Sequence, residues 1–210
     1  MIITRLRDRK ERAFVLYQIF LVFVLPVLLL VFRIVPISWR MIVLCCAMLL
    51  MYNIIRQEQW PDAVFGISKK TFIRSLLPYA LFTIIGVFTI IFISERLGIE
   101  PEVSWWSIPH LRFLFLPVSL LQEIAYRGFL FPKLRQATNN WTLIIVTNTL
   151  LFTLIHVIYP MKDVMIPFAA IAGVSFAIMY RYFPNLILIS ISHSVLNFVA
   201  ILYGFFFIPR

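Results

Sequence analysis

Charged side chains are scarce in this sequence, and that scarcity excludes a soluble domain. Only 13% of the 210 residues are Asp, Glu, Lys or Arg, whereas 62% are hydrophobic and the mean hydropathy is +0.95. Soluble domains have about 25% charged and about 45–50% apolar residues. The composition therefore predicts an integral membrane protein, an all-α polytopic bundle of transmembrane helices.

Cysteine is almost absent as well. The two cysteines, Cys45 and Cys46, are adjacent within one apolar run. They imply neither a disulfide framework nor a metal site, and we expect both to be small core residues. The sequence also has no internal repeat and no low-complexity tract. We therefore expect a single integral membrane domain over residues 1–210.

Apolar runs predict about seven transmembrane helices, each near the ~20 residues that cross a bilayer. The first run follows a basic segment, but it is longer than the roughly 7–15 residues of a signal-peptide core and no small-residue cleavage site follows it. The predicted spans cover residues 13–32, 37–55, 76–94, 113–131, 142–159, 164–180 and 186–208. The connection from Trp60 to Arg74 mixes apolar and basic residues, and it is either a short interfacial segment or a plain loop.

Basic residues indicate the orientation of the chain. With the N-terminus inside, the inner segments carry twelve Lys and Arg residues, Lys133 among them, and the outer segments carry six. Cytoplasmic loops are enriched in basic residues, so we predict that the N-terminus is cytoplasmic. We expect the protein to be a multi-pass protein of the cell membrane. The basic residues that give the net charge of +10 cluster beside apolar runs. This placement favours contact with the lipid bilayer over nucleic-acid binding.

A few polar side chains fall inside predicted spans. Glu123 and Arg127 lie in the fourth span, His156 in the fifth, and His193 and Asn197 in the seventh. A charge at the bilayer centre costs roughly 2.5 to 3.5 kcal/mol, so these groups should face the protein interior, where they can converge. Glu123 and Arg127 are four residues apart on one helix face; alone, they also fit a purely structural ion pair.

This set of groups is sufficient for several kinds of chemistry. A carboxylate, two imidazoles, an amide and a guanidinium can activate a water and stabilise an oxyanion. Alternatively, Glu123, His156 and His193 could hold a divalent metal such as zinc, although the HExxH pattern is absent. A transporter or proton relay would also use such groups, but here they lie only in the last four spans. At about 1.5 Å per helical residue, His193 should lie nearer the inner side of the membrane than His156. The two can share a site only if a helix is tilted or a span boundary is shifted.

Three short motifs in this order resemble a known family. Gln122-Glu123-x-x-x-Arg127, Phe152-x-x-x-His156 and His193-x-x-x-Asn197 look like the EExxxR, FxxxH and HxxxN motifs. These motifs mark the CPBP family, the CAAX prenyl protease type II and bacteriocin-processing intramembrane proteases. The resemblance covers residues 111–200, which we expect to carry the catalytic helices.

The resemblance implies an intramembrane endopeptidase that cleaves membrane-associated peptides or proteins. By analogy, His156 and the first acid of EExxxR would activate a water, and His193 with Asn197 would stabilise the oxyanion. The first acid is replaced here by Gln122, which cannot accept the proton. Three interpretations follow: Glu123 acts as the base after a helix rotation, His156 acts alone with Gln122 positioning the water, or the protein is a catalytically silent relative that binds, for example, a peptide toxin in self-immunity.

Overall fold

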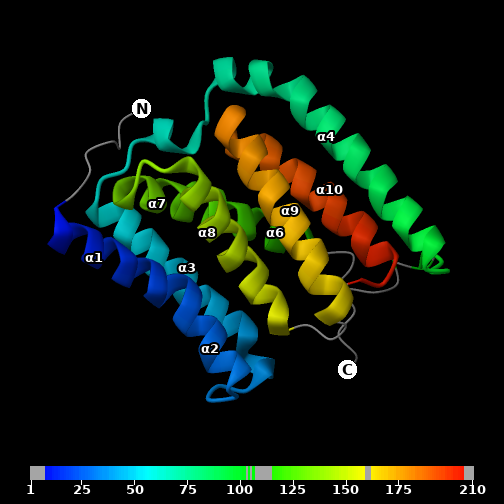
Figure 1. Cartoon of the computed structure of the whole chain (residues 1–210), viewed down its shortest axis with the longest axis horizontal. Coiled ribbons are helices and arrows are strands. Elements are labelled where there is room, and N and C mark those ends of the chain that lie inside the picture. Colours follow the sequence, from blue (N-terminus) through cyan, green and yellow to red (C-terminus); the bar gives the residue numbers. More distant parts are fainter. Residues whose placement is uncertain (1–7, 103, 105, 107–114, 159–161, 206–210) are drawn as a thin grey trace.

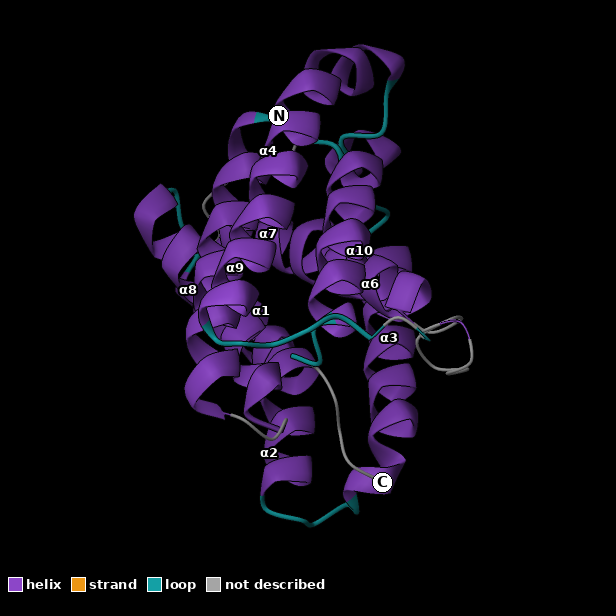
Figure 2. Cartoon of the chain, turned by 90° about the vertical axis from the view of Figure 1, so that its right-hand side faces the viewer, coloured by secondary structure: helices purple, strands orange, loops and turns teal. Residues whose placement is uncertain are grey.

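The protein is a bundle of helices. The computed structural model describes residues 8–102, 104, 106, 115–158 and 162–205, and these residues form helices joined by short connections, with no strand among them (Figure 2). The all-α class predicted from the composition is therefore confirmed.

The helices follow one another along the chain with few interruptions. The first half contains α1 (Arg9–Ile19), η1 (Phe20–Val24), α2 (Leu25–Val31), η2 (Ile37–Trp39), α3 (Arg40–Gln57), η3 (Asp62–Phe65) and α4 (Lys69–Arg96). The second half contains α6 (Phe115–Glu123), η5 (Ile124–Leu130), α7 (Phe131–Ala137), α8 (Trp141–Leu154), η6 (Ile155–Ile158), α9 (Lys162–Tyr182) and α10 (Leu186–Leu202). The segments η1 and η5 are π-helical, whereas η2, η3 and η6 are 3₁₀ turns.

Seven helical segments match the seven predicted spans. Five of them are long and apolar enough to cross a membrane: Arg9–Val31, Ile37–Gln57, Ala63–Arg96, Trp141–Ile158 and Lys162–Tyr182. The fourth segment in chain order runs without a break from α6 through η5 to α7, and the seventh, α10, is apolar but shorter than the five. The predicted ends at 113–114, 159 and 206–208 lie outside the described residues. The third segment starts earlier than predicted, because a 3₁₀ turn and the first turns of α4 occupy much of the Trp60–Arg74 connection.

The two cysteines correct one expectation. Cys45 and Cys46 are free and exposed on α3 rather than buried in the core. An apolar helix in a bilayer can turn small apolar residues towards lipid, so hydrophobicity alone does not separate the core face from the lipid face.

Helix directions agree with the alternation of seven spans. On α4, Tyr79 OH donates at 3.1 Å to the carbonyl of Phe183, just before α10 begins, and Thr83 Oγ1 lies 2.7 Å from Ser192 Oγ of α10. Contacts that advance together along both helices mean that the third and seventh segments run parallel. Figure 1 shows α4 beside α10 at one edge of the bundle, with α1 and α2 at the opposite edge.

Two prolines accompany the two π-helical segments. Pro26 follows the end of η1 by two residues, and Pro132 follows the end of η5 by two residues. A proline ring lacks an N–H and clashes with the carbonyl four residues earlier. A widened turn just before the ring relieves that clash, and such turns are frequent at functional sites. In η5, the widened turn lies directly after Glu123.

Candidate active site

The centre of the bundle holds a buried ion pair on one helix. Glu123 ends α6 and Arg127 lies in η5, and both side chains are 0% exposed. Arg127 Nη1 donates to Glu123 Oε1 at 3.0 Å, and Nη2 donates to the Gly173 carbonyl of α9 at 3.2 Å. A buried charge requires such partners, since its desolvation is otherwise uncompensated.

Aromatic rings enclose the guanidinium. The Arg127 Cζ atom lies 4.9 Å from the Phe152 ring centroid and 5.3 Å from that of Phe176, within the range of a cation–π contact. Gly173 allows α9 to approach α8 closely, because a Cβ atom there would lie 3.2 Å from the Phe152 ring. The guanidinium is therefore held by charge, by a backbone carbonyl and by two ring faces.

His193 joins the same carboxylate from α10. Its Nδ1 lies 2.6 Å from Glu123 Oε1, and both side chains are buried. Asn197, one turn after His193, donates from Nδ2 to Oγ of Ser119, one turn before Glu123, at 2.9 Å. The pairs 119–197 and 123–193 advance in opposite directions, so α6 and α10 are antiparallel, as the fourth and seventh spans should be.

His156 lies across Phe152 from His193. The His156 ring centroid is 5.1 Å from that of Phe152, which in turn is 5.8 Å from that of His193. Both imidazoles therefore border one phenyl ring, and the depth difference expected from the sequence does not separate them. His156 Nδ1 lies 2.8 Å from the Phe152 carbonyl, which can only accept. Nδ1 therefore carries a proton, and in the neutral ring the lone pair is on Nε2.

Gln122 Oε1 does not hydrogen-bond to the other residues of this cluster. The residue is half-buried, and its Oε1 has no hydrogen-bond partner among the described residues. The outer carboxylate oxygen of Glu123, Oε2, is likewise buried without a protein partner in that part of the chain. The two adjacent side chains thus present unsatisfied acceptors, but only Glu123 can take up a proton.

The described residues contain no preformed group of three metal ligands. Across residues 8–102, 104, 106, 115–158 and 162–205, no three His, Cys, Asp or Glu side chains are grouped to hold a metal ion. Glu123 Oε1 and His193 Nδ1 bond to each other, so those two atoms are not both directed at one ion. We derive no step through a metal.

Several neighbours of the site were not anticipated from the sequence. Ser119 lies four residues before Glu123, a spacing that places it on the same helix face, and this signal was available. Asn148 was also detectable as a polar residue in an apolar run: its Nδ2 donates to the Tyr126 carbonyl in η5 at 2.8 Å. The roles of the Gly173 carbonyl and the Phe176 ring could not be recognised from the sequence, because backbone carbonyls and phenylalanine rings occur throughout the apolar helices.

A second buried cluster lies two turns beyond Arg127. Lys133 on α7 is 0% exposed, and its Nζ donates to Gln18 Oε1 at 2.6 Å and to Glu58 Oε1 at 2.5 Å. Glu58 Oε2 accepts from Trp60 at 2.9 Å and from Gln136 at 3.3 Å. From the sequence, Lys133 is expected to be an ordinary basic residue of a cytoplasmic connection. The structure corrects this, because Lys133 is a buried cross-link between the fourth segment and the first two.

The protonation of Glu58 follows from these contacts. Burial raises the pKa of Glu58, but hydrogen bonds from Lys133, Trp60 and Gln136, together with the ammonium charge, hold that pKa below its ordinary value. The pair is therefore ionised at neutral pH.

Fold and site together define a multi-pass helical membrane protein with an acid, an arginine and two histidines in its core. Residues 104–199 match the family described as "Type II CAAX prenyl endopeptidase Rce1-like". This match supports the relationship to the CPBP family that the three motifs indicated. The matched segment contains every motif residue, whereas Gln18 and Glu58 lie outside it. Neither the curated proteins nor the solved structures contain a match to the chain.

Proposed function

We propose that this protein is an intramembrane endopeptidase of the cell membrane that cleaves membrane-associated peptides or proteins. Its family supports a CAAX-protease-like function in general terms. The observation that carries the proposal is the buried Glu123 carboxylate: Oε1 is fixed by Arg127 and His193, while Oε2 has no partner among the described residues. A buried, oriented and unsatisfied acceptor is what a hydrolytic water requires.

The proposed reaction uses the groups as they lie. Glu123 Oε2 or His156 Nε2 takes a proton from the water, and the water oxygen attacks the peptide carbonyl carbon. The carbonyl oxygen becomes an oxyanion, which accepts hydrogen bonds from His193 and from Asn197. The base then delivers its proton to the leaving amine as the C–N bond breaks, which yields an acid and an amine.

Two details of hydrogen bonding support the oxyanion role. Asn197 donates one N–H to Ser119, and its amide carries a second N–H. His193 directs Nδ1 at the Glu123 carboxylate. It can donate from Nε2 at the same time only as an imidazolium, which the neighbouring carboxylate stabilises. Glu123 would therefore serve both as a base and as a counter-ion.

The test is cleavage of candidate membrane peptides by the purified protein in detergent, with and without a chelator. Glu123→Ala and His156→Ala should each reduce the rate by about 10²–10⁴, the usual worth of general-base help. Gln122→Ala should cost less, because Gln122 could only position the water. Cleavage that survives both Glu123→Ala and His156→Ala would exclude the assigned base. Loss of cleavage with chelator would require a metal in the reaction.

A catalytically silent relative is the second candidate. Two observations favour it: the first acid of the motif is Gln122, and Glu123 Oε1 is already in contact with both Arg127 and His193. Such a protein would bind a membrane peptide, as in self-immunity to a peptide toxin, without cleaving it. In that case the wild type should be inactive but retain the peptide. Gln122→Glu should then create cleavage if the missing carboxylate is the whole difference.

A further inference from the structure

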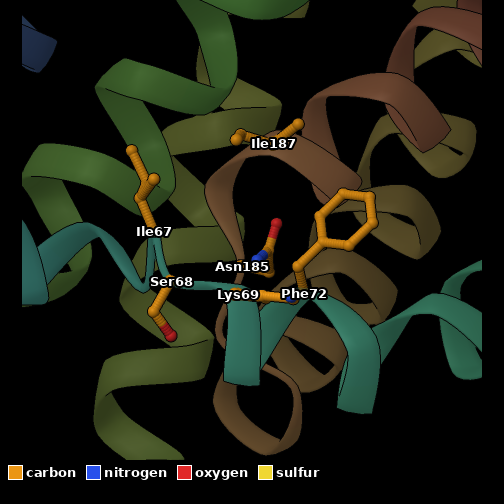
Figure 3. A pocket seen from close by; sticks show the side chains of 6 residues that line it. All are labelled: Ile67, Ser68, Lys69, Phe72, Asn185 and Ile187. Carbon is orange, nitrogen blue, oxygen red and sulfur yellow. The ribbon is translucent and has the colours of Figure 1, made fainter.

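A cavity of about 310 Å³ lies where α4 and α10 begin, away from the buried histidines. It is lined by Ile67, Ser68, Lys69, Phe72, Asn185 and Ile187 (Figure 3). Its walls come from two turns that are far apart in the sequence. A Cβ atom on Gly66, whose φ is +65°, would lie 2.3 Å from the Pro184 carbonyl oxygen. The two turns are therefore in direct contact.

Asn185 fixes the inner wall of this cavity. It is completely buried, and its Oδ1 accepts from the Leu188 N–H at 2.9 Å. Its Nδ2 lies 3.3 Å from both the Gly66 carbonyl and Thr71 Oγ1. Since both ends of the amide are occupied, Asn185 shapes the cavity, and the charge at its rim comes from lysine.

Three exposed cations lie at this end of α4, and one of them, Lys69, lines the opening. Lys69, Lys70 and Arg74 lie in the first turns of α4, where the first turn has no acidic residue. Cations at a helix N-terminus oppose the macrodipole, and like charges four residues apart, such as Lys70 and Arg74, repel each other. Within the described part of the chain, none of the three forms an ion pair. An anion from outside the protein would offset their mutual repulsion.

An apolar track leads from the cavity towards the bilayer centre. On α10, Ile187 and Ile191 are 44% and 52% exposed, and on α4, Leu76 is 50% exposed, one turn beyond Phe72. Both helices run in the same direction, so both rows lead away from the cations. Residues 187–195 of a helix span about 12 Å at 1.5 Å per residue. That is close to one leaflet, about half of the ~30 Å hydrocarbon core.

We infer that this cavity binds one anionic phospholipid of the leaflet that faces the beginnings of α4 and α10. Its phosphate lies against Lys69 at the opening, Lys70 and Arg74 add positive charge at the same end of α4, and an acyl chain follows the track along Ile187 and Ile191. An ammonium and a guanidinium suit a phosphate, and anionic headgroups attract basic residues beside a membrane-spanning helix. At one end of two parallel helices, a charged surface lies next to an apolar surface. The charged headgroup and the apolar acyl chain of a lipid are arranged in the same way.

The test counts bound lipids by native mass spectrometry after the full-length protein is titrated with phosphatidylglycerol or phosphatidylcholine in detergent. One phosphatidylglycerol should be retained in preference to phosphatidylcholine. Each basic residue near a membrane surface is worth about fivefold in affinity, so Lys69→Gln/Lys70→Gln/Arg74→Gln should weaken binding on the order of a hundredfold. If the triple variant does not fold, Lys69→Gln alone should still show about a fivefold loss.

Two further variants separate a defined site from diffuse attraction. Arg9→Gln/Lys10→Gln/Arg56→Gln removes three other exposed cations and should leave the retained lipid unchanged. Ile187→Trp keeps every charge but fills the cavity, and it should also abolish retention. Equal retention of the two lipids, an equal loss in the control variant, or unchanged binding by Ile187→Trp would overturn the inference. Displacement of the lipid by millimolar inorganic phosphate would do the same, because it would indicate a site for a soluble anion.

Discussion

The two buried ion pairs of this protein differ in how completely their polar atoms are satisfied. Both oxygens of Glu58 accept hydrogen bonds, and Lys133 is held between Glu58 and Gln18. Glu123, by contrast, has one oxygen shared by Arg127 and His193 and another without a protein partner among the described residues. A saturated pair can only hold helices together. A pair with an unsatisfied oxygen beside two histidines can also bind a water or a substrate group.

Their sequence origins differ as well. Glu123 and Arg127 are four residues apart on one helix, whereas Lys133 reaches partners 75 and 115 residues away. The Lys133 partners come from α1 and the end of α3, outside the segment that matches the family. The N-terminal helices therefore contribute more than hydrophobic surface: they anchor the helix that carries the candidate site.

The largest effect should come from Glu123→Ala. This change leaves Arg127 fully buried without its carboxylate and deprives His193 of its acceptor. Removing one partner of a buried pair costs about 3–5 kcal/mol, and the cleavage rate should fall by the factor that general-base help supplies. Thermal unfolding and peptide cleavage, measured on the same preparation, test both expectations. A stable but inactive variant would mean that the carboxylate is catalytic yet structurally dispensable.

Glu58→Ala should separate stability from activity. It leaves Lys133 buried, and we expect a loss at the lower end of about 3–5 kcal/mol, because Gln18 still accepts from Nζ and the Glu58 side chain is 18% exposed. Cleavage per folded molecule should be unchanged below the unfolding temperature. Glu58→Gln is the matched control, since it retains hydrogen-bond acceptors without the charge. A loss of cleavage equal to that of Glu123→Ala would abolish the distinction between the two pairs.

Local periodicity explains what the sequence could predict. The apolar runs located the helices, although α4 begins at Lys69 rather than at residue 76 and α7 ends at Ala137 rather than at residue 131. The four-residue spacing of Glu123 and Arg127 placed both on one face. The contact of His193 with Glu123 depends on the register between α6 and α10, which no single run encodes. The burial of Lys133 was missed because a lysine just after an apolar run ordinarily extends to the interface. Its partners become visible only when α1 and α3 pack against α7. The catalytic roles of the motif residues stay predictions.

The saturated pair should also respond to acid. Because the pKa of Glu58 is lower in the folded protein than in the unfolded chain, its ionisation stabilises the fold above an unfolded pKa of about 4.3. That contribution is lost as the pH falls through the folded-state pKa. The melting temperature of wild type should therefore drop in acid more steeply than that of Glu58→Gln between roughly pH 5 and 3. Parallel curves for the two proteins would show that Lys133 does not stabilise the carboxylate.

The smallest effect should arise at the edge of the candidate site. Ser119→Ala removes the acceptor of the Asn197 side chain, and a neutral hydrogen bond is worth about 0.5–1.5 kcal/mol. If Asn197 stabilises an oxyanion, losing the group that orients it should lower kcat while KM changes little. Ser119→Thr, which keeps the hydroxyl, should restore the rate. Ser190→Ala is the control, because that buried hydroxyl donates to the Leu186 carbonyl of its own helix at 2.7 Å. If both variants lose the same stability but only Ser119→Ala lowers kcat, Ser119 acts in the candidate site together with Glu123. If kcat is unchanged in both variants, Ser119 is a packing residue.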